Sequence, residues 1–91
     1  MISEEHKRLA IFTVKNVVRG TSPVLLVVHD NDNEWQFLPN ESVTEEDIMI
    51  ISLENIIKID PTLEEILWIP EGTEAVREDT GKDWTTKIYL E

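Results

Sequence analysis

The sequence predicts an α+β domain, in which two or three short helices pack on a mainly antiparallel sheet of four to six short strands. Two features of the chain predict this class. Apolar or alternating runs of strand length recur between clusters of turn-forming residues, and helix-capping residues precede a few short stretches with helical spacing. The 91 residues suffice for one hydrophobic core but not for two. We therefore expect residues 1–91 to form one domain, with residues 1–8 as a frayed N-terminus.

The opening of the chain predicts one strand and one short helix. Residues 9–12 form an apolar run typical of a strand, and Thr13 is expected to cap a helix over residues 14–19. Valines of that segment fall at i, i+3 and i+4, on one face of the helix. Gly20 is expected to end it in the left-handed conformation.

A β-hairpin is expected next. Residues 24–28 have no polar face, which is typical of a strand covered on both sides and therefore central in its sheet. Residues 30–33 are all Asp or Asn, whose side chains bond to nearby backbone in turns. The alternating residues 34–38 then pair with the first strand and place Trp35 and Phe37 in the core.

The middle of the chain predicts a buried strand and two capped helices. The apolar residues 48–51 are typical of a buried strand, and Ser52 is expected to cap a turn of helix after it. Asp60 is expected to cap the next helix, because Pro61 suits the first helical position.

The last part of the chain predicts two more strands. Residues 70–72, which are Pro-Glu-Gly, should stop the preceding helix. Residues 73–78 alternate weakly, as in an edge strand, and residues 79–82 should form a turn. Residues 84–90 are expected to form the final strand.

The charge of the chain is strongly uneven. Residues 1–29 carry four bases against two acids, whereas residues 30–91 carry 17 acids against four bases, which gives the net charge of −11. A small domain cannot bury so many carboxylates, so they are expected to coat its surface. Such a coat favours a basic protein partner and repels nucleic acid.

The composition also bears on the cellular compartment. The chain has no cysteine, so disulfides and thiolate metal sites are excluded, which suits a reducing cytoplasm. The longest apolar run, residues 24–28, is far shorter than the roughly 20 residues that span a bilayer. The N-terminus shows no signal peptide. We therefore expect a cytoplasmic protein without a membrane partner.

No pattern in the chain predicts a catalytic, cofactor or metal site. Residues 30–41 have the ligand spacing of a calcium loop, but Trp35 stands where that loop needs glycine, and strands are expected on both sides of it. His29 precedes Asp30, but neighbours in a strand point to opposite faces, and no serine or cysteine nucleophile is near in the sequence. We therefore expect no cofactor and do not favour an enzyme.

Four residues are candidate partner contacts. Packing at the end of the last helix is favoured for Trp68, and an exposed interface position stays open for it. Two roles stay open for Trp84, which can cover a sheet edge or contact a partner. Glu64 and Glu65 lie in the first turn of the same helix, on an expected solvated face. Arg77 can pair with a carboxylate inside the fold or outside it.

Three short motifs follow one another along the chain: W-x-F-L at residues 35–38, D-P-S/T-L at residues 60–63 and P-x-G-x-x-A-x-R at residues 70–77. Together they resemble a family of small uncharacterised bacterial proteins, some of which are labelled immunity-like. The resemblance covers roughly residues 10–84, and its motifs are caps, turns and core positions. It therefore implies no catalytic residues, but it does imply binding, as by a protein that neutralises a toxin.

Two functions follow as hypotheses. The first is a non-enzymatic bacterial binding protein with an acidic surface, which the resemblance extends to an immunity-like protein that neutralises a cationic toxin. The alternative is a structural or regulatory module that self-associates into a homo-oligomer through a sheet edge or through Trp68.

Overall fold

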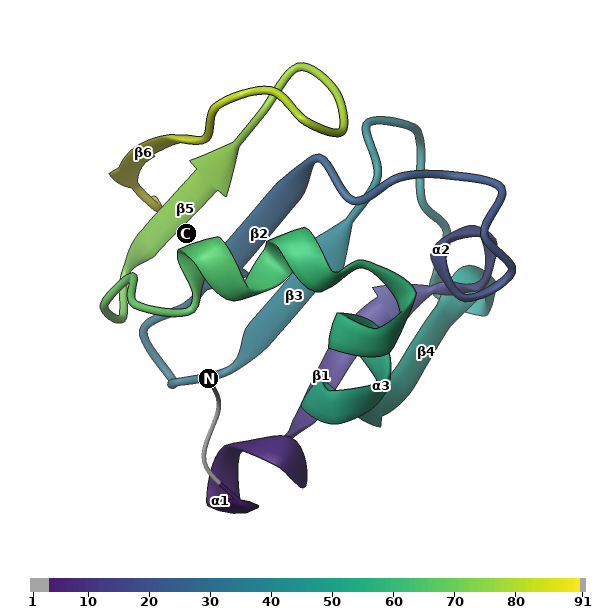
Figure 1. Ribbon diagram of the computed structural model, residues 1–91, viewed down its shortest axis with the longest axis horizontal. Helices are drawn as coiled ribbons and strands as arrows, with labels where there is room; N and C mark the ends of the chain where they lie inside the picture. The colour runs from purple at the N-terminus through teal and green to yellow at the C-terminus, as the bar shows by residue number, and fades with distance from the viewer. Residues whose placement is uncertain (1–3, 91) are drawn as a thin grey trace.

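The computed structural model describes residues 4–90 and has the predicted α+β class (Figure 1). Its strands are β1 Ala10–Val14, β2 Leu26–His29, β3 Trp35–Leu38, β4 Ile48–Ser52, β5 Thr73–Val76 and β6 Thr85–Ile88. Its helical segments are the α-helices α1 Glu4–Lys7, α2 Lys15–Val18 and α3 Leu53–Ile59 and the 3-10 helices η1 Glu45–Asp47 and η2 Pro61–Ile66. Of the segment expected to fray, residues 1–3 lie outside the described residues and the next four form α1.

The strands form one six-stranded mixed sheet in the order β4-β1-β3-β2-β5-β6. Its β1–β3 pairing is parallel, whereas the β1–β4, β2–β3, β2–β5 and β5–β6 pairings are antiparallel. The predicted hairpin is confirmed, with Val27 opposite Phe37 and His29 opposite Trp35. β2 lies inside the sheet, as its apolar sequence predicts.

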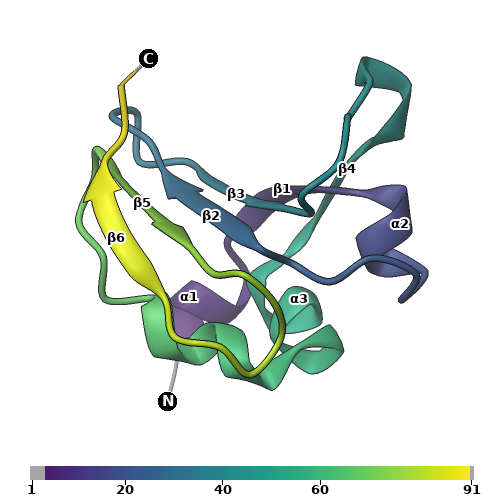
Figure 2. The same cartoon turned by 90° about the horizontal axis from the view of Figure 1, so that it is seen from above.

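Most of the helical segments lie on one face of the sheet. Figure 2 shows α1 and α3 on the same side of the strands, while the opposite side of β1, β2 and β3 has no helix over it. The core fills the space between the two layers, where Ile11, Phe37 and Ala75 of the sheet meet Ile56 and Leu63 of the helical segments. We call the opposite side the open face of the sheet. None of the helices in the described part of the chain has the length and apolar character needed to cross a bilayer.

Two of the three predicted helix caps are confirmed. The hydroxyl of Ser52 accepts a backbone amide of α3, and the carboxylate of Asp60 accepts a backbone amide of η2. The prediction for Thr13 is wrong. This residue is buried in β1, where its hydroxyl donates to the carbonyl of Phe37 in β3 at 2.7 Å, so α2 begins without a side-chain cap.

Two strands occupy other places in the sheet than the sequence predicts. The interpretation of residues 48–51 as a buried strand is wrong, because β4 is an edge strand whose Ile48 and Ile50 are 46% and 63% exposed. The interpretation of residues 73–78 as an edge strand is also wrong, because β5 lies between β2 and β6. Both differences concern strand order, which depends on pairing between distant segments.

Candidate binding surface

The open face carries an apolar row that crosses most of the sheet. Strand pairing brings together one apolar side chain from each of five strands. These are Ile48 of β4, Val14 of β1, Leu38 of β3, Leu26 of β2 and Val76 of β5. Ile48 and Val76 are exposed, Leu26 and Leu38 are half-buried, and Val14 is buried. The accessible part of the row is therefore interrupted at Val14, and exposed apolar surface of this kind is typical of a binding site.

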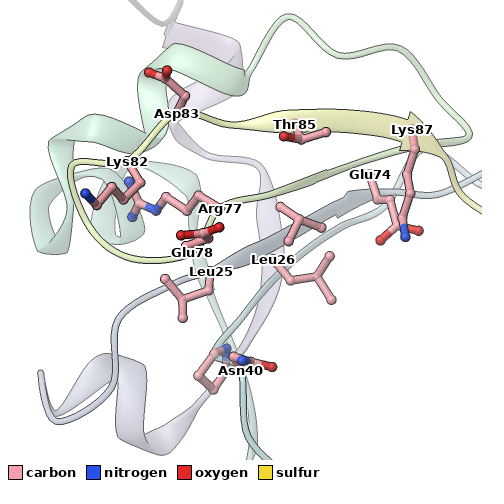
Figure 3. A pocket seen from close by; sticks show the side chains of 12 residues that line it. Leu25, Leu26, Asn40, Glu74, Arg77, Glu78, Lys82, Asp83, Thr85 and Lys87 are labelled. Atoms are coloured by element: carbon pink, nitrogen blue, oxygen red, sulfur yellow. The ribbon is translucent and has the colours of Figure 1, made fainter.

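Two hollows lie along this row. The larger has a volume of about 720 Å³ and is lined by Leu26, Val76 and neighbouring residues of β2, β5 and β6. Figure 3 shows its side chains rising from these strands, from the loop after β5 and from Asn40 after β3. The smaller, of about 310 Å³, lies at the other end of the row, between Leu38 and Ile48. The open face is therefore hollowed at both ends.

The charges at the two hollows differ. Acids and bases are nearly balanced around the larger hollow, whose charged lining residues are Glu74, Arg77, Glu78, Lys82, Asp83 and Lys87. Glu34 is the charged residue that lines the smaller hollow. The lining of the smaller hollow therefore lacks the bases that offset the acids around the larger one.

The sequence around β4 extends this imbalance. Residues 20–57, which include β2, β3, η1 and β4, contain eight acids and no lysine or arginine. These acids are Asp30, Asp32, Glu34, Glu41, Glu45, Glu46, Asp47 and Glu54. All of them except Asp30 are exposed or half-buried. We call residues 20–57 the acidic segment, and its field acts on the solvent and on any approaching molecule.

Asp30, the buried acid of this segment, stabilises the hairpin turn. Its carboxylate accepts the backbone amides of Asp32 and Glu34 at 2.9 and 3.0 Å. Asn33 in the same turn has a φ of 63°, a conformation that asparagine tolerates better than most residues. The spacing that resembles a calcium loop thus belongs to a turn between two strands.

His29 also has structural partners. Its Nδ1 atom lies 2.8 Å from the carbonyl oxygen of Ile69, and its Nε2 atom lies 2.6 Å from Oδ1 of Asn33. The imidazole stacks on Trp35 with 4.0 Å between the ring centroids. Both ring nitrogens are therefore engaged, and the side chain joins β2 to the segment that follows η2.

Arg77 pairs inside the fold. Its guanidinium donates to the carboxylate of Asp60 at 2.7 Å, to the hydroxyl of Thr62 at 2.9 Å and to the carbonyl of Val24 at 3.1 Å. It also lies over Trp84, 4.3 Å from the ring centroid. The Arg77 side chain is 1% exposed, so this cation belongs to the core and not to the surface.

The four candidate contacts from the sequence lie in different settings. Trp84 is half-buried, and its ring covers the guanidinium of Arg77. The packing favoured for Trp68 is wrong, because this side chain is 68% exposed. Glu64 and Glu65 are exposed on η2, as expected for a solvated face. These residues lie outside the acidic segment.

Sequence reasoning missed the residues of the apolar row. Ile48 belongs to a run that reads as a buried strand, and no local pattern shows that β4 is an edge. One signal was available. The absence of lysine and arginine from residues 20–57 marks this part of the chain as strongly acidic.

Comparisons of this chain with protein-family models, with curated proteins and with solved structures give no match. The resemblance to small immunity-like proteins therefore stays a prediction. The function must be argued from the surface and its charges.

Proposed function

We propose that this protein is a non-enzymatic binding protein that docks a basic protein partner on its acidic surface. The observation that carries the proposal is the acidic segment. It contains eight carboxylates and no lysine or arginine. Strands of this segment also contribute Ile48, Leu38 and Leu26 to the apolar row. A basic partner with apolar side chains at the centre of its contact surface would match both features.

Charge and apolar surface would have separate effects on binding. Opposite charges accelerate the encounter, over a distance of about 8 Å at physiological ionic strength. Burial of apolar side chains then slows dissociation. The resemblance supports a finer version of the proposal, in which the partner is a cationic toxin and this protein is its immunity-like inhibitor.

The first test is co-expression of this chain with the basic product of a neighbouring gene. We expect a stoichiometric complex in size-exclusion chromatography and protection of the host cell from that product. The association rate should fall steeply between about 0.05 and 0.5 M NaCl, because salt screens the attraction. The immunity-like function would be rejected if neither a complex nor protection were observed.

The second test compares two pairs of adjacent, exposed glutamates. The double variant E45K/E46K changes η1, inside the acidic segment, whereas E64K/E65K makes the same charge change on η2. We expect the first variant to lower the association rate with the basic partner by about tenfold and the second to lower it much less. Equal losses would show that docking does not depend on the acidic segment.

A further inference from the structure

We infer that β4 binds an extended basic segment of the partner as an additional strand of the sheet. The inference rests on the proposed function and specifies where and how the partner binds. Four observations support it: the place of β4 in the sheet, its exposed side chains, its unprotected edge and the charges before its start.

β4 is the first strand in the sheet order, with β1 on one side and no described strand on the other. Figure 1 shows it at the margin of the sheet. Its pairing with β1 continues without interruption from Ser52 opposite Ala10 to Ile48 opposite Val14. An edge strand directs alternate N–H and C=O groups away from its sheet, so β4 offers backbone partners over its length.

Two side chains of β4 on the open face, those of Ile48 and Ile50, are apolar and accessible. Ile50 is 63% exposed and Ile48 is 46% exposed, and Ile50 lies opposite the half-buried Phe12. A strand added beside β4 would place every second side chain next to these isoleucines. The apolar row would then continue from β4 into the partner.

The β4 edge lacks the features by which proteins usually prevent such pairing. Edge strands are commonly protected by lysine, proline or a bulge. Residues 48–52 are Ile-Met-Ile-Ile-Ser, without lysine or proline, and their register with β1 shows no bulge. The other edge strand, β6, contains Lys87. β4 is therefore the edge that is open to strand addition.

The charges before the start of β4 select a basic occupant. Three acids, Glu45–Asp47, precede the strand, and Glu54 follows it, where it pairs with Lys58 at 3.5 Å. Two bases flank the neighbouring strand, Arg8 before β1 and Lys15 directly after it. Lys15 lies at the η1 end, because Val14 pairs with Ile48, and the three acids there outnumber it. Parallel pairing with a second copy of the chain would bring the Glu45–Asp47 acids of both copies together, whereas a segment with lysine or arginine beside η1 would neutralise these acids.

Strand addition of this kind divides recognition between two parts of the occupant. Backbone hydrogen bonds supply affinity, and side chains at alternate positions supply specificity. The expected segment therefore has β-branched or other apolar residues at alternate central positions and bases at the end that lies beside η1.

The test uses a synthetic peptide of about seven residues, in which two lysines at each end enclose Val-Thr-Val. The peptide is titrated into the ¹⁵N-labelled protein, and the amide chemical shifts are followed by NMR. We expect the shifts to change mainly along β4 and β1. A peptide with proline in place of the threonine should bind at least about tenfold more weakly, because proline cannot donate to a strand and resists pairing.

Two protein variants provide the matched comparison. I50K places a cation on the β4 edge, and I88K makes the same change at Ile88, an exposed isoleucine of β6. We expect I50K to weaken binding of the lysine–valine peptide by at least about tenfold and I88K to have little effect, since both change the net charge equally. Equal weakening by the two variants, or equal binding of the proline peptide, would overturn the inference.

The outcomes separate this inference from the proposed function. If the lysine peptide binds with shifts spread over the acidic segment but not along β4, basic docking stands and strand addition is rejected. If neither the peptide nor the co-expressed basic protein binds, the proposed function itself fails. If light scattering shows a dimer that I50K dissociates, the occupant of the edge is a second copy, and the inferred partner is wrong.

Discussion

The two edge strands of the sheet are built in different ways. β4 is apolar and free of lysine and proline, and it is preceded by three acids in η1. β6 contains Lys87, which lies opposite Glu74 of β5, and it follows a loop that holds both Lys82 and Asp83. Acids at the β6 edge thus have bases beside them, whereas the three acids of η1 form no ion pair with any described residue.

The two edges also differ in what fixes them to the domain. The β5–β6 hairpin is joined to η2 by Arg77, whose guanidinium binds Asp60 and lies over Trp84. β4 is held by its pairing with β1 and by Leu53, at the start of α3, whose amide donates to the carbonyl of Leu9. The comparison teaches that a charge paired inside the fold stabilises it, while charges left unpaired at the surface remain available for binding.

The largest expected effect is that of Arg77→Met, which removes the cation that anchors the β6 side. We expect the free energy of unfolding to fall by about 3 kcal/mol, because the carboxylate of Asp60 is left without its partner in a mostly buried site. Urea denaturation followed by tryptophan fluorescence measures this change. Lys58→Met is the control, because its ion pair with Glu54 is exposed and should contribute no more than about 0.5 kcal/mol. Similar losses for both variants would remove the distinction between a buried and an exposed ion pair.

Gly72→Ala tests the residue before β5, whose backbone is hydrogen-bonded to the ends of β2 and β6. The amide of Gly72 donates to the carbonyl of His29, and its carbonyl accepts the amide of Tyr89. Its φ is 76°, and an added Cβ would lie 2.7 Å from Oδ1 of Asn31. We expect a loss of about 2 kcal/mol in unfolding free energy, from strain together with this contact.

The matched control for Gly72→Ala is Gly81→Ala. Gly81 has a φ of 85°, but an added Cβ would meet no atom within 4 Å. Only the cost of the left-handed conformation remains, which is about 1 kcal/mol. Thermal unfolding monitored by circular dichroism would rank the two variants, and the reverse order would contradict the role assigned to Gly72.

Ser52→Ala tests the end of β4, where the strand turns into α3. The hydroxyl of Ser52 accepts the amide of Asn55 at 3.1 Å, so its removal should cost about 1 kcal/mol of unfolding free energy. Ser42→Ala, at an exposed loop position, should change stability by less than about 0.5 kcal/mol. Parallel urea titrations measure both. A silent Ser52→Ala would show that this cap does not stabilise the β4 side.

The smallest expected effect concerns the edge isoleucines themselves. Ile50→Thr and Ile88→Thr both retain a β-branched side chain at an exposed position of an edge strand. Each should change the free energy of unfolding by less than about 0.5 kcal/mol. If Ile50→Thr alone destabilised the protein by well over that amount, Ile50 would serve the fold, and the β4 edge would no longer be a surface reserved for binding.

Features that depend on a few neighbouring residues could be predicted from the sequence. The hairpin follows from the Asp and Asn residues between two strand-like runs, and the structure gives Asp30 the backbone bonds expected of such a turn. The caps Ser52 and Asp60 were predicted because each lies directly before its helical segment.

Features that depend on distant segments could not be predicted. The parallel pairing of β1 with β3 and the edge position of β4 are set by strand order, for which the sequence has no local signal. For the same reason Thr13 was assigned to a cap although its hydroxyl meets β3.

The candidate surface was predicted in part. Composition alone indicated an acidic coat, but the place where the coat meets exposed apolar side chains appears only when Ile48 and Ile50 are located at the edge. The partner of Arg77 was likewise open, because Asp60 is one of many acids in the chain.

The sheet order has a consequence for how the protein is made. β2 lies between β3, which is translated soon after it, and β5, which is translated much later. A ribosome that has reached Gly72 therefore carries a nascent chain in which β2 lacks one neighbour and Asp60 lacks its guanidinium. We expect the six-stranded sheet to be completed only when the C-terminal hairpin has left the exit tunnel. Chains truncated before Arg77 should therefore become substrates for chaperones and proteases.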